Sequence, residues 1–224
     1  MRSLFFVLLT ILFVGCHKEK PEIIASNSVK PTDTISVASD YAEFKNSVLK
    51  HKKELSPRPY KEISDYFFTL INNDIYSYWK GTPWDFYGTT RIPKSGTIAC
   101  GYFVTTTLED VGLKIKRREL AECRSGDMIK ALCTDIHSFT KLEKLKAWLK
   151  SQPNNSVFII GLDFHTGYII KDSSDCYFMH SFYANNIGVV KEKVDESTIL
   201  QYNNYFMIGS LTANEKLLRK WVEK

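Results

Sequence analysis

The chain has 224 residues, is 44% hydrophobic and 13% aromatic, and carries a formal net charge of +5. These values are those of a globular protein with one sizeable core, and they exclude a disordered or fibrous chain. The basic excess is small and scattered along the sequence, so we expect no nucleic-acid binding.

The first residues read as an export signal. A basic start at Arg2 precedes an apolar run over 4–14, which is shorter than the roughly 20 residues that a membrane span needs. The run ends in Phe13-Val14-Gly15-Cys16, which resembles the lipobox of bacterial lipoproteins. The resemblance implies a signal peptide over 1–15, lipidation of Cys16 and a membrane lipid anchor. An ordinary cleaved signal with an incidental Cys16 is the alternative.

A polar segment follows the signal. His17 and Lys18 stand where an aspartate retains some lipoproteins in the inner membrane, so we expect the outer membrane, on its periplasmic face. Residues 16–40 are rich in Ser, Thr, Pro, Lys and Glu without a sustained apolar period, which predicts a flexible tether. Residues 41–224 make up the single predicted domain, which we expect to be monomeric.

The hydrophobic periodicity of this domain changes along the chain, from helical in the first half to extended in the second. Helices are predicted over 60–71, 97–113, 117–139, 142–149 and 217–222, with a capping box at Thr140–Glu143. Strands are predicted over 157–162, 165–170, 177–182, 188–194 and 205–210. Helices followed by an antiparallel sheet indicate the α+β class.

Cys100 is the candidate nucleophile. It follows a turn of small residues from Gly96 and opens an apolar helix. At a helix start, the macrodipole and the unpaired backbone N–H groups favour thiolate over thiol. The alternative interpretation is a small buried core residue.

Two histidines are the candidate partners of that thiol. If Asp172-Ser173 is a two-residue hairpin loop, His165 lies directly opposite His180 on one face of the sheet. One imidazole is then a base and the second orients it; polar strand residues or a metal pair are the alternatives. Cys176 lies about 13 Å along the strand from His180, too far to complete a metal site.

The remaining cysteines suggest no metal centre. Cys123 and Cys133 are the most plausible disulfide pair in an exported protein. The sequence has no Cys-x-x-Cys pair and no Cys/His quartet, so we expect no structural zinc, no other metal and no cofactor.

Between residues 78 and 194 the chain resembles the NlpC-type cell-wall peptidases, whose core is a papain-like fold. The resemblance rests on an aromatic segment between Gly81 and Gly88, the helix that Cys100 opens, the strand that begins at His165, and His180 on the next strand. It implies a nucleophile helix packed on an antiparallel sheet.

The resemblance also implies roles for individual residues. Cys100 is the nucleophile, His165 the general base and acid, and His180 the residue that orients it, while the backbone N–H of Cys100 contributes to an oxyanion hole. The aromatic residues around the cysteine, Trp84, Tyr87 and Tyr102, are then substrate-binding. The family commonly has Asp before the cysteine and Ser-Gly after it, where this chain has Ala99, Gly101 and Tyr102. It favours tyrosine at the place of Trp84.

The expected function is therefore hydrolysis of amide bonds in peptidoglycan peptides by a tethered envelope thiol enzyme. Two alternatives stay open. The same Cys-His machinery can serve deamidation, acyl transfer or amide cleavage on a non-wall substrate, and a lipoprotein without activity can bind the envelope through its aromatic loop.

Overall fold

The computed structural model describes residues 31–184 and 187–223. The expected signal peptide, the lipidation site Cys16 and residues 16–30 of the expected tether lie outside the described residues. Helix α1 (Pro31–Glu54) includes residues 31–40, so the prediction of a flexible tether is wrong for that stretch. The helix buries Tyr41 and Val48, which share one face because seven residues make about two turns.

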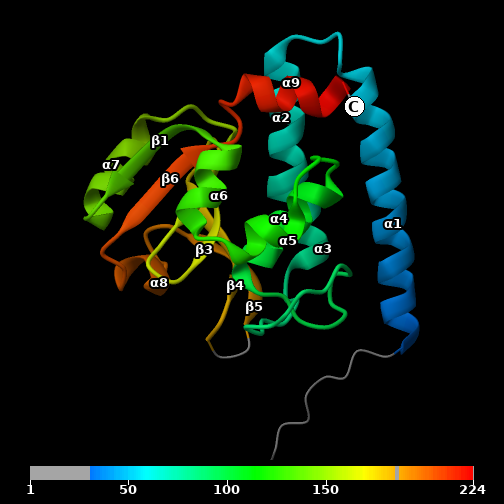
Figure 1. Ribbon diagram of the computed structural model, residues 1–224, viewed down its shortest axis with the longest axis horizontal. Coiled ribbons are helices and arrows are strands. Elements are labelled where there is room, and N and C mark those ends of the chain that lie inside the picture. Colours follow the sequence, from blue (N-terminus) through cyan, green and yellow to red (C-terminus); the bar gives the residue numbers. More distant parts are fainter. Residues whose placement is uncertain (1–30, 185–186, 224) are drawn as a thin grey trace, which may run out of the picture.

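The first half of the domain is helical, as predicted. Helix α2 (Tyr60–Thr69) runs through a π-helical turn, η1 (Leu70–Ile75), into α3 (Tyr76–Trp79). The next helices are α4 (Cys100–Asp110), α5 (Arg117–Glu122) and α6 (Ser125–Leu132). Figure 1 shows α1 to α5 on one side of the molecule and the sheet on the other.

The second half forms a six-stranded antiparallel sheet in the order β1-β6-β2-β3-β4-β5. The strands are β1 (Thr134–Phe139), β2 (Ser156–Gly161), β3 (Thr166–Lys171), β4 (Cys176–Phe182), β5 (Gly188–Lys193) and β6 (Phe206–Ser210). The helices of this half are α7 (Leu142–Ser151), α8 (Thr198–Gln201) and α9 (Glu215–Glu223). The predicted α+β class is confirmed.

Strand β1 contradicts the helix predicted over 117–139. Helices α5 and α6 end at Glu122 and Leu132, and the chain then pairs with β6 at the edge of the sheet. The burial pattern of β1 is mostly exposed, so its sequence carries little of the apolar alternation that marks a strand.

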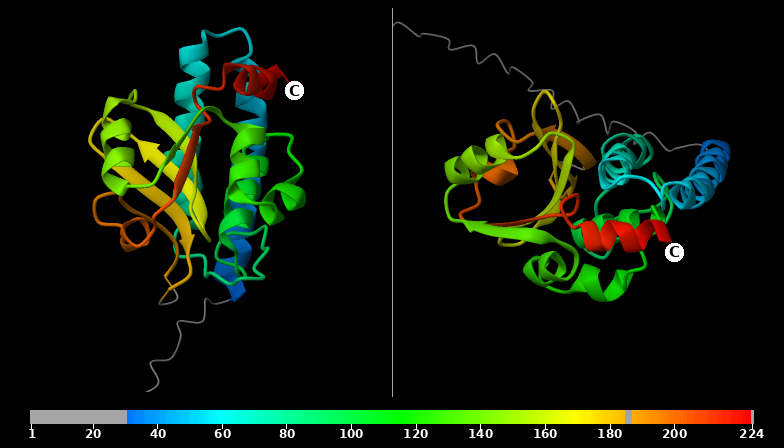
Figure 2. Two further views of the ribbon diagram at one scale, coloured as in Figure 1. Left: turned by 60° about the vertical axis from the view of Figure 1, so that its left-hand side comes forward. Right: turned by 90° about the horizontal axis from the view of Figure 1, so that it is seen from above.

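The sheet is covered on both faces. Val157 and Ile159 of β2 pack into the cluster formed with α2, α4 and α6, whereas Phe158 and Ile160 pack with residues of α7 and α8. Figure 2 shows the curved sheet between these helices. Because successive side chains of a strand point to opposite faces, a fully buried β2 serves both cores.

The capping box predicted at Thr140–Glu143 is wrong. Helix α7 begins at Leu142 after Lys141, whose side chain makes no capping hydrogen bond. The predicted apolar face is nevertheless present, since Leu145 and Leu149 are buried. None of the described helices is long and apolar enough to cross a bilayer.

The loop between β3 and β4 is longer than predicted. Lys171 pairs with Cys176, so residues 172–175 form the loop in place of a two-residue turn. Asp172 Oδ1 accepts hydrogen bonds from the backbone N–H groups of Ser174 and Asp175, at 2.7 and 2.8 Å. This Asx turn stabilises the four-residue loop and moves the pairing along the strand by two residues.

Candidate active site

Cys100 is the first residue of α4 and follows Ala99, whose backbone is extended. The methyl side chain of Ala99 makes no capping hydrogen bond, so the first-turn N–H groups of α4 have no side-chain cap from it. Tyr168 of β3 fixes this helix to the sheet by donating to the carbonyl of Val104, at 2.9 Å. The expected packing of the nucleophile helix on the sheet is confirmed.

The thiol of Cys100 lies at the end of the sheet where β3 begins. Burial raises the pKa of Cys100, and the backbone N–H groups of Thr166, Gly101 and Cys100 itself oppose that rise in part. The N–H groups of the helix start lower the pKa of Cys100, as expected, but burial outweighs them and the net pKa is raised. The Thr166 amide places the sulfur beside the residue that follows His165.

The two histidines contact each other directly. His165 Nε2 lies 2.8 Å from His180 Nδ1, and the rings meet edge to face with centroids 4.9 Å apart. The predicted direct cross-strand pairing is wrong, because the longer loop places His180 opposite Gly167. The register differs from the expected one by two residues, an even number, so both imidazole rings still lie on the same face of the sheet.

Glu192 and Ser197 extend this contact and were not predicted. Glu192 Oε1 lies 3.3 Å from His180 Nε2. Burial raises the pKa of Glu192, but hydrogen bonds from His180 and Ser197 outweigh it and lower the pKa below its usual range. Glu192 is the one acidic residue of β5, between Lys191 and Lys193. A single acidic residue between two lysines was the one sign of Glu192 in the sequence, but only the β4–β5 register brings its carboxylate to His180.

The hydrogen bonds fix the tautomers of both rings. Ionised Glu192 only accepts, so His180 carries its proton on Nε2 and accepts at Nδ1. His165 therefore donates from Nε2, which leaves its Nδ1 as a lone-pair base. Burial and then the neighbouring His180 lower the pKa of His165 to about 3, and burial lowers that of His180 despite Glu192. Both imidazoles are neutral at pH 7, and Nδ1 of His165 takes no part in the hydrogen-bonded chain Glu192-His180-His165.

Helix α5 explains Gly101. A Cβ at this position would overlap the carbonyl oxygen of Ala121, so a serine there, as the family commonly has, has no room. The Tyr102 hydroxyl donates to Glu122 at 2.7 Å, and the Tyr102 ring lies under the guanidinium of Arg117.

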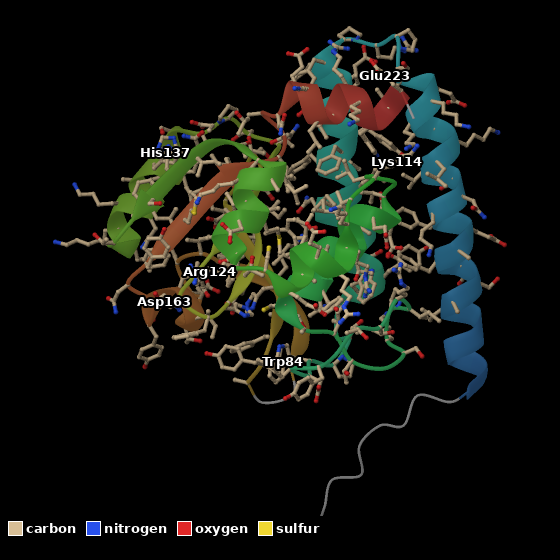
Figure 3. The ribbon with its side chains drawn as sticks, viewed as in Figure 1. Trp84, Lys114, Arg124, His137, Asp163 and Glu223 are labelled. Atoms are coloured by element: carbon tan, nitrogen blue, oxygen red, sulfur yellow. The ribbon has the colours of Figure 1, made fainter. Side chains whose placement is uncertain are left out.

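Two hollows meet at Cys100 and His165. A smaller hollow of about 210 Å³, called the polar hollow below, is lined by Arg124, Ser125 and Asp163 together with Cys123, Met128, Leu162 and Phe164. An aromatic trough of about 410 Å³ is lined by Trp84, Phe86, Tyr87, Tyr102, Phe164 and Tyr183. Figure 3 shows Arg124 and Asp163 together on the sheet side, with Trp84 apart from them. The three predicted aromatics all line the trough, whereas Phe164 and Tyr183 come from turns that the sequence pattern left unassigned.

Among residues 31–184 and 187–223, the other thiols form no disulfide. Cys123 and Cys133 are both free, so the pairing considered for them is absent. Within the described part of the chain, no group of three or more His, Cys, Asp or Glu side chains is arranged to hold a metal ion.

Comparison with known proteins gives no match. No family model, no curated protein and no solved structure matches the chain. The chemistry of the site therefore rests on its geometry.

Proposed function

We propose that this chain is a thiol hydrolase of amide bonds in which Cys100, His165 and His180 are the reacting and orienting groups. The observation that carries the proposal is the ordered contact between His165 Nε2 and His180 Nδ1, backed by Glu192. That arrangement gives one imidazole a fixed tautomer beside a thiol at a helix start, which is what nucleophilic catalysis needs.

The reaction proceeds in two steps. As the sulfur of Cys100 bonds to the carbonyl carbon, His165 Nδ1 takes the thiol proton, and His180 with Glu192 stabilises the imidazolium. The backbone N–H of Cys100 faces the negative charge that develops on the carbonyl oxygen. His165 returns the proton to the leaving amine, and the C–N bond breaks. A water then attacks the thioester with His165 again as base, releasing the acid and the thiol.

Peptidoglycan peptides are the proposed substrate class. The order of the aromatic segment, the Cys100 helix, the His165 strand and the His180 strand supports an NlpC-like, papain-like fold. The lipobox ending at Cys16 supports a lipid-anchored enzyme on the periplasmic face of the outer membrane, where the cell wall lies.

One observation favours a second candidate, the same chemistry on an amide outside the wall. The carbonyl oxygen of Ala121 fills the space beside Gly101 at the position where family members commonly carry Ser. Peptide recognition through that serine is therefore excluded in this chain.

The test is digestion of purified peptidoglycan by the full protein, its Cys100→Ala variant and a Cys176→Ala control, read as fragment masses. Cys176 is also a free, partly exposed thiol, but it lies at the far end of β4. We expect the same fragments from wild type and Cys176→Ala, and none from Cys100→Ala. If all three proteins release identical fragments, or if wild type releases no fragments, the proposal of a wall-directed thiol hydrolase is contradicted.

A further inference from the structure

Four aromatic side chains of the trough are strongly exposed. The exposed fraction is 98% for Phe164, 84% for Tyr87, 70% for Phe86 and 52% for Tyr183. Single exposed apolar side chains are ordinary on a protein surface, but a cluster of them around a hollow marks a binding surface. The cluster borders Cys100 and His165, so its ligand is part of the substrate.

Two rings of the trough, those of Trp84 and Tyr183, are held in place by ring contacts. Trp84 meets Tyr183 edge to face at 6.0 Å, and Tyr183 meets the ring of His165 at 5.7 Å. A preorganised wall of this kind loses little conformational freedom on binding. Whatever packs on Trp84 and Tyr183 is therefore positioned relative to the general base.

The trough also carries polar groups that discriminate between ligands. The hydroxyls of Tyr87, Tyr183 and Thr89 have no hydrogen-bond partner within residues 31–184 and 187–223. A hydrocarbon chain seated on them would leave them unpaired in a drier environment, which is unfavourable. A pyranose ring has C–H faces that pack on aromatic rings and hydroxyls that pair with these groups.

We propose that the aromatic trough binds a saccharide joined to the scissile peptide, an inference that rests on the proposed function. The volume of about 410 Å³ lies within the usual range of small-ligand sites, roughly 300–1,000 Å³. The enzyme would then prefer stem peptides that are still attached to the glycan. The polar hollow on the other side of Cys100 receives the remaining peptide.

Saccharide binding is measured first without catalysis. The full-length Cys100→Ala protein is titrated with N-acetylchitotetraose in a calorimeter. The same titration is made with three double variants, in which Cys100→Ala is combined with Trp84→Ala, Phe164→Ala or Tyr202→Ala. Tyr202 is 86% exposed but does not line the trough, so it is the matched control. We expect saturable binding that Tyr202→Ala retains, and that the Trp84 and Phe164 substitutions weaken by about tenfold or more. Absence of binding, or equal loss in all three variants, overturns the proposal.

Hydrolysis is compared second. A disaccharide-tetrapeptide and the same tetrapeptide without sugar are offered to the otherwise wild-type protein and to Phe164→Ala. We expect kcat/KM to be about tenfold higher with the sugar, and this advantage to disappear in Phe164→Ala and to persist in the control variant Tyr202→Ala. Equal rates on both substrates, or a preference for a decanoyl-peptide, contradict a saccharide site. Saccharide binding without hydrolysis of either substrate contradicts the proposed function alone.

Discussion

Gly167 lies directly opposite His180 on the neighbouring strand, and a Cβ at Gly167 would come within 2.7 Å of the Cβ of His180. It would also come within 2.8 Å of the ring of Phe178, on which the His180 ring stacks at 4.0 Å. Because Gly167 has no side chain, His165 reaches diagonally across the strand pair to His180. The glycine is thus a spatial requirement of the imidazole pair.

His180→Asn should retain more activity than His180→Ala. An asparagine amide oxygen can replace Nδ1 of His180 as the acceptor for the N–H of His165, whereas alanine leaves that buried N–H unpaired. We expect kcat to fall by about tenfold in the asparagine variant and by about 100-fold in the alanine variant, with KM little changed. Steady-state kinetics on a peptidoglycan peptide measure the difference. Equal losses in both variants would show that His180 does not act as the acceptor.

Glu192→Gln removes a charge but keeps an acceptor. The neutral amide still bonds to His180, but it stabilises the imidazolium of His165 less when the thiol proton is transferred. We expect kcat to fall by about tenfold, and the matched exposed substitution Glu196→Gln to have no effect. Unchanged kcat in Glu192→Gln would mean that the carboxylate has only a structural role.

Alkylation of Cys100 by iodoacetamide should be slow near neutral pH, because burial favours the neutral thiol and only the thiolate reacts. Since burial raises the pKa of Cys100, we expect the rate to rise with pH through a value above the ordinary thiol pKa of about 8.5. His165→Ala should lower the rate near neutral pH by removing the base. Mass spectrometry of the Cys100 peptide measures both effects. A rate that stays constant down to about pH 5 would instead show a preformed thiolate-imidazolium pair.

Gly101→Ala tests the contact between α4 and α5. In an ordinary helix interior this substitution stabilises by up to about 1 kcal/mol, but here the new methyl group meets the carbonyl oxygen of Ala121. We expect the free energy of unfolding in urea to fall by about 1–3 kcal/mol. Gly126→Ala in α6 is the control, because its Cβ would meet only the flexible thioether of Met207, at 3.1 Å. Greater stability of Gly101→Ala than of wild type would contradict the described packing.

Acid should destabilise the fold through His165. Its pKa falls from 6.5 to about 3 in the folded state, so only the unfolded state binds a proton between these values. The free energy of unfolding is therefore level above about pH 6.5 and decreases as the pH falls, by about 2 kcal/mol at pH 5 for this group alone. Urea titrations of wild type, His165→Gln and the exposed-site control His51→Gln, each at a series of pH values, measure this dependence. A pH dependence that His165→Gln leaves intact would assign the effect to other groups.

The sequence predicted the principal residues of the site because each prediction depended on local pattern. Cys100 opens a helix, and His165 and His180 share a face of the sheet for any even shift of register. The incorrect loop length therefore did not affect the prediction that the two histidines lie together. The strands β2, β3, β4 and β6 were visible because each carries a short apolar run that is mostly buried.

Features that depend on long-range contacts could not be predicted. Tyr41 makes α1 part of the core by donating to Asp110, at 2.8 Å and 69 positions along the chain, which no local periodicity reveals. Glu192 joins His180 only through the β4–β5 register. The β3–β4 loop was misjudged because Asp172 stabilises a longer turn than its neighbours suggest.

The thiol and its base come from opposite halves of the chain. Ser181 of β4 donates to the carbonyl of Ile98, at 2.7 Å across 83 positions, and so joins the segment before Cys100 to the strand of His180. In the unfolded chain Cys100 and His165 are not held near each other, so the proposed activity requires the complete tertiary structure. Recovery of the proposed activity on refolding would therefore report the docking of the two halves.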